Sequence, residues 1–179
     1  MSLTLLQGSL IVFVLGCALG AALLKDTLAS VMSFAAYSLG ISIIWLVLQA
    51  PDVGLTEAAV GAGIMTILFL LALANTVTPD ADRLLESISW PTVALVGGFV
   101  LVMGATVPAL PVIGDPTSPV VGGEVTQYYL ANAYEETEVK NAVTAVLAAY
   151  RGFDTLGEAV VVFSAGVVAL SVLRREVFA

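Results

Sequence analysis

The stretch APDVGLTEAAVGAG, residues 50–63, decides the fold because it opens the third of a series of apolar segments. It carries two carboxylates, Asp52 and Glu57, and the segment that follows, IMTILFLLALA (64–74), carries no charge. An acid inside a membrane helix costs about 2.5–3.5 kcal/mol on insertion scales, so it normally faces protein or water. These two acids are therefore the first candidates for functional residues.

The composition places the whole chain in a membrane. Of its 179 residues, 59% are hydrophobic and only 11% are charged, against about 25% in soluble domains. The mean hydropathy is +1.03. A soluble fold would have too little polar surface to cover itself, so we expect an integral membrane protein. The net charge of −8 argues against nucleic-acid binding, which needs a basic face.

Five segments are long and apolar enough to cross a bilayer as helices, which takes about 20 residues each. We therefore predict an all-α, polytopic membrane protein. The predicted spans are residues 3–24, 28–48, 55–74, 90–110 and 155–173.

The long connection between the last two spans, residues 111–154, opens with proline and glycine and then becomes helix-forming from Ala131 to Tyr150. The purely apolar part of that stretch, residues 142–149, is too short to span a bilayer. We expect a lateral amphipathic helix that lies along the membrane surface or packs on a partner.

Positively charged residues in short loops predict the orientation. With five spans, four of these positively charged residues fall on one side of the membrane and two on the other. The side with four is expected to be the cytoplasm, so the N-terminus lies outside and the C-terminus in the cytoplasm. The two groups are Lys25, Arg83, Arg174 and Arg175 on the inner side, and Lys140 and Arg151 on the outer side.

The sequence offers few groups for catalysis. It has no His, its single cysteine is Cys17, and we find no nucleophile–base constellation, phosphate loop or metal-ligand cluster. We expect a protein that is not an enzyme and that needs no cofactor or metal. What remains is a set of carboxylates near the ends of membrane helices.

Asp52 and Glu57 have different interpretations. Asp52 follows Pro51 in a short turn, where we expect it to be the N-cap of the third helix. Glu57 lies deeper, past the usual capping position. We expect it to act in proton or cation transfer; the alternative is an interfacial acid paired with a partner subunit.

The second group of polar residues lies in YRGFDTLGEAVVVFSAG, residues 150–166. Thr155 and Glu158 fit a capping box before an apolar run, and Asp154 is an alternative cap. Arg151 is close enough in sequence to pair with Asp154. These polar residues either mark the start of the fifth helix or form a transport site.

The third and fifth helices begin on the same side of the membrane whenever there are five spans. Glu57 and Glu158 both lie near those starts, so we expect them at one depth. Two acids at one depth can hold a proton between them, because like charges raise one pKa.

Gly61 and Gly63 remove side chains from two turns of the third helix. They indicate either close packing of a neighbouring helix or a π-bulge.

Two of these stretches carry a family resemblance. APDVGLTEAAVGAG and the apolar run after it resemble the D subunit of archaeal membrane-bound hydrogenases and the matching part of the A subunit of Mrp-type Na⁺/H⁺ antiporters. NAVTAVLAAYRGFDTLGEAVV, residues 141–161, resembles the E subunit of the same hydrogenases. The D-like part is also similar to the J-type subunit of respiratory complex I. The family often reads ALT where this chain has GLT at Gly54.

The resemblance implies the organisation of the chain. It divides into a D-like three-helix part (1–79), a fourth span with an outer linker (80–139) and an E-like part (140–179). The resemblance implies that the D-like and E-like parts are fused in one chain, without the large antiporter-like part that precedes them in the Mrp A subunit.

The resemblance also implies a function. The expected role is a subunit of a multisubunit cation/proton antiporter that moves Na⁺ and H⁺ in the cell membrane with partner subunits. The alternatives are the membrane arm of an ion-pumping hydrogenase or respiratory complex, and a structural scaffold. Glu57 and Glu158 align with acids thought to line the ion route, with Asp52 and Asp154 supporting them. The helix with Gly61 and Gly63 is the candidate functional bulge.

Overall fold

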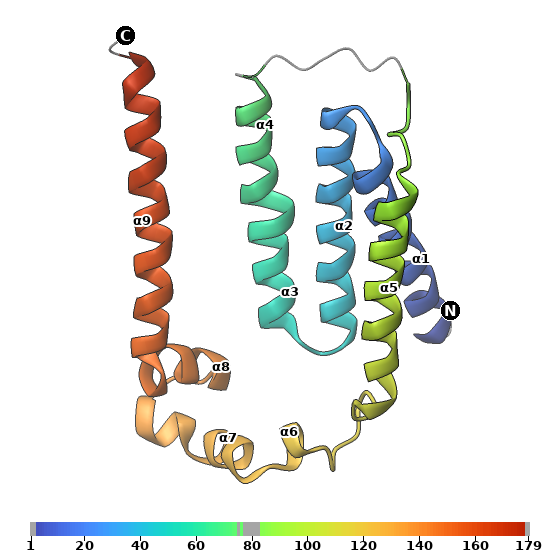
Figure 1. Cartoon of the computed structure of the whole chain (residues 1–179). Helices are drawn as coiled ribbons and strands as arrows, with labels where there is room; N and C mark the ends of the chain where they lie inside the picture. Colours follow the sequence, from blue (N-terminus) through green and yellow to red (C-terminus); the bar gives the residue numbers. More distant parts are fainter. Residues whose placement is uncertain (1–2, 75, 77–82, 178–179) are drawn as a thin grey trace. The chain divides into compact units, whose positions relative to one another are not determined.

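The computed structural model describes residues 3–74, 76 and 83–177, and of residues 3, 4 and 172–177 only the backbone. Among these residues the chain is helical, with no strand and with one isolated bridge between Leu24 and Leu85. It forms two compact units, Met1–Phe99 and Val100–Ala179 (Figure 1). The predicted polar loop at 75–89 lies partly outside the described residues.

Five helical stretches have the length and hydropathy to cross a membrane, which confirms the predicted polytopic all-α class. They are Leu5–Leu23, Thr27–Val47, Pro51–Ala74, Trp90–Ala109 and Gly152–Ser171. Most of their large apolar side chains are exposed, as expected of surfaces that face lipid or partner proteins.

The first unit is built around α2 (Thr27–Val47). This helix contacts α1 (Leu3–Leu23) and also the third span, which consists of α3 (Pro51–Glu57), η1 (Ala58–Met65) and α4 (Thr66–Ala74) (Figure 1). Asp26 caps α2 by accepting the backbone N–H of Ala29 at 3.1 Å. α5 (Trp90–Thr106) is divided by the boundary between the units, and it ends in a short 3₁₀ turn, η2 (Val107–Ala109), which belongs to the second unit.

Small residues form the contacts of this unit. Gly40 of α2 lies against Val14 of α1, where an added Cβ would be 2.6 Å from Val14 Cγ2. An added Cβ on Gly20 would be 2.7 Å from the Ser33 hydroxyl oxygen. Such residues let helix backbones approach closely in a bilayer, where apolar burial gives little driving force for association.

The second unit contains the long connection and the last span. Its elements are α6 (Pro119–Gly122), α7 (Glu124–Thr137), α8 (Ala142–Ala145), η3 (Val146–Tyr150) and α9 (Gly152–Val177). In Figure 1, α7 runs across the N-terminal end of α9 and α8 lies beside that end.

The prediction of one continuous helix from Ala131 to Tyr150 is wrong. α7 begins earlier, at Glu124, and stops at Thr137, because Glu138 takes a left-handed backbone conformation with φ 59°. A new helix then starts with Asn141 as its N-cap, whose side chain accepts the N–H groups of Val143 and Thr144.

Candidate functional site

The third span begins one residue before Asp52. Ala50 is the N-cap and Pro51 is the first helical residue, so the expectation that Asp52 caps the helix is wrong. The reason is that proline has a fixed φ and no N–H, which suits it to the first helical position and makes the residue before it the cap. Asp52 lies in the first turn, where the helix dipole favours a negative charge.

The middle of the third span is a π-helix rather than an α-helix. Residues Ala58–Met65 form η1, which includes Gly61 and Gly63 and starts directly after Glu57. The Thr66 hydroxyl donates to the Gly61 carbonyl at 3.3 Å. π-Segments inside α-helices are rare and occur frequently at functional sites. The two glycines differ, because a Cβ on Gly63 would make only an ordinary contact, 3.5 Å from the Ala58 carbonyl oxygen.

Gly61 lies between two polar side chains. A Cβ added there would be 2.5 Å from the Ser38 hydroxyl oxygen and 2.6 Å from Oε1 of Glu57. Ser38 belongs to α2 and is only 2% exposed, and Glu57 is half-buried. The absence of a side chain at Gly61 therefore brings the Glu57 carboxylate close to a buried hydroxyl on the neighbouring helix.

A second polar contact fixes the start of the third span against α2. Ser42 donates from its hydroxyl to the carbonyl of Gly54 at 2.7 Å, and both residues are buried. A Cβ on Gly54 would lie 3.0 Å from the backbone oxygen of Ser42 and 3.1 Å from Cγ of Leu46. The glycine at this position thus allows the close approach that places Glu57 beside α2.

The residues of this region, which we call the Glu57 cluster, are few. They come from α2 and the third span and are Ser38, Ser42, Gly54, Glu57, Gly61 and Thr66. Sequence reasoning missed the three hydroxyl residues. The signal for Ser38 and Ser42 was present: two serines four positions apart lie on one face of an otherwise apolar helix.

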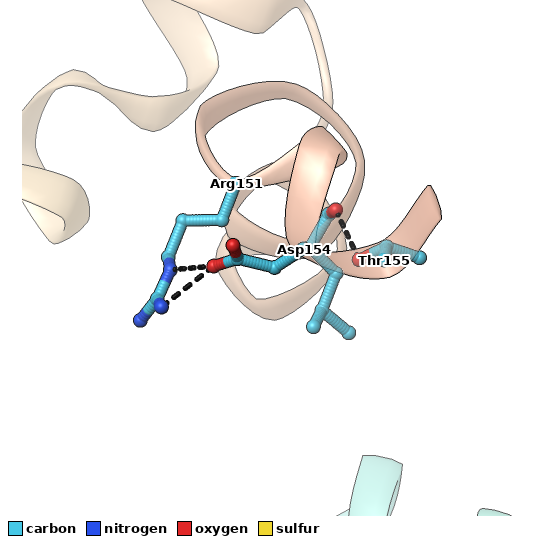
Figure 2. Close-up of polar contacts among 4 residues, drawn as sticks. Arg151, Asp154 and Thr155 are labelled. Atoms are coloured by element: carbon cyan, nitrogen blue, oxygen red, sulfur yellow. Dashed lines mark hydrogen bonds and ion pairs between the residues drawn. The ribbon is translucent and has the colours of Figure 1, made fainter. Parts of the chain in front are cut away.

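In the second unit, Arg151 and Asp154 form an ion pair, as their spacing predicted (Figure 2). The Nε and Nη2 atoms of Arg151 each lie 2.6 Å from Oδ2 of Asp154. The two side chains are 66% and 54% exposed in this chain. An exposed pair of this kind contributes about 0–1 kcal/mol to stability.

The predicted capping box at Thr155 is wrong. α9 already begins at Gly152, and the Thr155 hydroxyl donates to the carbonyl of Leu147 in η3 at 2.8 Å (Figure 2). Asp154 is not a cap either, because it lies inside the first turn of α9. The π-turn runs directly into α9: the Arg151 N–H bonds the Val146 carbonyl at 2.8 Å. The helix therefore starts earlier than the sequence indicated.

Glu158 lies in the second turn of α9 and is exposed. Within the described residues its carboxylate forms no hydrogen bond or ion pair. Glu57 and Glu158 belong to different units, so their matched depth stays a prediction.

A cluster of tyrosines around Glu136 was also missed by sequence reasoning. Tyr128 donates to Oε1 of Glu136 at 2.7 Å, and Tyr150 donates to Oε2. The ring of Tyr129 packs on Tyr150 with centroids 4.8 Å apart. These contacts tie α7 to η3 next to the last span.

The hydrogen bonds change the acidity of this cluster. The bonds from Tyr150 and then Tyr128 lower the pKa of Glu136, because they favour the charged carboxylate. The bond to Glu136 raises the pKa of Tyr150 to about 12. It also raises the pKa of Tyr128. Glu136 is therefore held as an anion at neutral pH.

No group of three or more cysteine and carboxylate side chains is arranged to hold a metal ion among the residues described. The Glu57 cluster offers instead one carboxylate, hydroxyls and backbone carbonyls. Such oxygens suit proton transfer and the binding of hard cations such as Na⁺.

Comparison with known proteins agrees with these two regions. Residues 12–77 match the MbhD family, the D subunit of MBH, and residues 97–178 match the MbhE family, the E subunit of MBH. The chain belongs to the MbhD and MbhE families. This confirms the resemblance carried by APDVGLTEAAVGAG and RGFDTLGE.

Relatives of this MbhD–MbhE chain are antiporter subunits. A Na(+)/H(+) antiporter subunit A1 from Staphylococcus haemolyticus is 33% identical over 159 residues, which is 85% of this chain and 18% of the relative. The same-named subunit from Staphylococcus epidermidis is 29% identical over 165 residues (92% and 20%). A putative antiporter subunit mnhA2 from S. haemolyticus is 32% identical over 128 residues (70% and 15%). The chain thus spans about a fifth or less of the length of these relatives.

Proposed function

We propose that this chain is a membrane subunit of a multisubunit Mrp-type cation/proton antiporter and that it forms part of the route of the transported Na⁺ or H⁺. The observation that carries the proposal is Glu57, a half-buried carboxylate at the start of a π-helix inside a membrane span. The antiporter subunits to which the chain is similar support the same function.

Several features of Glu57 suit an ion carrier. It makes no ion pair within the described residues, so no fixed cation competes for its charge. It lies near the hydroxyl of Ser38, which can share a proton or a cation with it. A carboxylate in a membrane span usually has such a function, because its insertion is costly.

The test is Na⁺-dependent proton movement in inside-out membrane vesicles that contain the complete complex. Glu57→Gln keeps the shape of the side chain and removes its charge, so we expect at least a hundredfold lower rate with normal assembly on native gels. Glu86→Gln, a change at an exposed acid outside the spans, is the matched control and retains the parental rate. A parental rate in assembled Glu57→Gln would refute the proposal.

The proposal includes three further residues. Glu158 would be a second carrier of the transported ion, and Asp52 and Asp154 would support the two glutamates. Glu158 is the stronger candidate of the second unit, since Asp154 already pairs with Arg151. Glu158→Gln should lower transport in the assembled complex, whereas a loss of assembly alone would favour a scaffold.

A second function follows from the name of the matched families, MBH. The same chain would then serve in the membrane arm of an ion-pumping hydrogenase or respiratory complex, with redox chemistry in the partners. Gentle detergent extraction and identification of the copurified proteins separates the two: antiporter subunits alone favour the first function, and redox subunits favour the second.

The orientation also belongs to the proposal: N-terminus outside and C-terminus in the cytoplasm, supported by the positive residues of the short loops. Single cysteines introduced at exposed loop positions in a Cys17→Ala background, labelled from one side of the membrane, test it. Labelling of a cysteine near Glu124 from outside is expected.

A further inference from the structure

Ser38 is the most buried side chain of the first unit that carries a hydroxyl, at 2% exposure. Within the described residues its hydroxyl donates no hydrogen bond, whereas Ser42, one turn later on α2, donates to Gly54. Among the described residues no fully buried side-chain oxygen or nitrogen lacks a partner, so the Ser38 hydroxyl oxygen is not sealed off and can turn to a nearby acceptor.

The Glu57 carboxylate is close to that hydroxyl. Both oxygens lie within 2.6 Å of one point, the place that a Cβ of Gly61 would take, so they are no further apart than twice that distance. The Glu57 carboxylate likewise accepts no hydrogen bond within the described residues. The torsions of a glutamate side chain are broad near its end, so a small rotation brings Oε1 to the hydroxyl.

We propose that Ser38 donates a hydrogen bond to the Glu57 carboxylate and so positions it for ion transfer. The proposal rests on the proposed function of Glu57. Ser38 is a positioning residue, since it acts through Glu57, and Gly61 is the residue that keeps the space between them open.

The role of Gly61 follows from the same distances. An alanine at this position would bring its Cβ to 2.5 Å from the Ser38 oxygen and 2.6 Å from Oε1 of Glu57, closer than such contacts allow. The Glu57 carboxylate, as the far end of a flexible side chain, would move away first. Gly61→Ala should thus break the Ser38–Glu57 hydrogen bond without removing either group.

The experiment measures Na⁺-dependent proton movement in vesicles with the complete complex, with assembly checked on native gels. A hydrogen bond to a charged group is among the stronger ones, so we expect Ser38→Ala and Gly61→Ala each to lower the rate by about tenfold or more. Ser38→Cys, which keeps a weak donor, should lie between Ser38→Ala and the parent. Gly16→Ala, in α1, is the control for Gly61, because a Cβ added there meets nothing within 4 Å.

A double-mutant cycle separates positioning from simple packing. Aspartate at position 57 is one methylene shorter and does not reach the space beside Gly61. Ser38→Ala should therefore cause little further loss in a Glu57→Asp background. Equal fold-losses in the parent and in Glu57→Asp overturn the proposal, as does a parental rate in Ser38→Ala.

Different results would refute the role of Ser38 and the proposed function of Glu57. A parental rate in Glu57→Gln refutes the proposed function itself. Loss of transport in Glu57→Gln together with a parental rate in Ser38→Ala and Gly61→Ala refutes only the role of Ser38.

Discussion

The Ser42 hydroxyl of α2 donates to the Gly54 carbonyl of α3 at 2.7 Å, in a part of the first unit that is buried. This hydrogen bond links the second membrane span to the third. Glu57 lies three residues beyond Gly54 on the same helix, so the bond also sets the distance of the candidate carboxylate from α2. The stability of this contact and the geometry of the candidate site are therefore linked.

We expect Ser42→Ala to destabilise the chain by about 1–3 kcal/mol, because the buried Gly54 carbonyl would lose its side-chain donor. Thermal unfolding of the protein in mild detergent measures the change. Ser164→Ala is the control, since its hydroxyl donates to a carbonyl within its own helix and is exposed. Equal stability losses in the two variants would contradict the prediction.

Gly54→Ala should also lower the unfolding temperature, although alanine favours helices by about 1 kcal/mol over glycine. The new Cβ would lie 3.0 Å from the Ser42 backbone oxygen, which belongs to the helix and yields little. Gly16→Ala, where a Cβ meets nothing within 4 Å, should be neutral or stabilising. An unfolding temperature raised by both variants would show that the contact is loose.

The spans could be predicted because hydropathy and length are properties of local sequence, and their bounds agree with the prediction to within a few residues. The Ser38–Gly61–Glu57 arrangement could not be predicted, because it depends on which face of α2 meets the third span. The break at Glu138 was missed because glutamate is a good helix former and its left-handed φ is set by the surrounding fold. Asn141, a preferred N-cap, was the available signal.

Thr155→Val should destabilise the junction of η3 and α9 by about 0.5–1.5 kcal/mol. Valine keeps the shape of the side chain but removes the hydroxyl that donates to Leu147 at 2.8 Å. Thr155→Ser, which keeps the donor, is the control and should stay near the parent. Thermal unfolding and hydrogen exchange of the backbone around residue 151 measure the effect. A serine variant as unstable as valine would show that the methyl group, and not the hydrogen bond, matters.

The tyrosine cluster predicts an unusual titration. The pKa of Tyr150 is about 12, against an ordinary value of 10.0, because its hydroxyl donates to Glu136. The folded pKa is raised, so the contribution of Tyr150 to stability is complete below pH 10.0 and is lost as the pH rises through about 12. The pKa of Glu136 is lowered, so its contribution is present above its unfolded pKa and is lost as the pH falls through the folded one.

Tyrosinate absorbance as a function of pH measures the first of these changes. The difference between the parent and Tyr150→Phe isolates Tyr150 and should have its midpoint near pH 12. In a Glu136→Gln background the same difference should titrate closer to 10.0, because the carboxylate acceptor is gone. An unchanged midpoint would show that burial, and not Glu136, raises the pKa.

Asp154→Asn should change stability by less than about 1 kcal/mol, because the Arg151–Asp154 pair is exposed and is screened by salt. Transport should fall more strongly, since the unpaired Arg151 guanidinium would repel cations near the start of the last span. If this charge is the cause, Arg151→Met combined with Asp154→Asn restores most of the rate in the vesicle assay. An equally low rate in the double variant, with the complex assembled, would instead assign the loss to the Asp154 carboxylate itself and would place that residue among the groups that bind the transported ion.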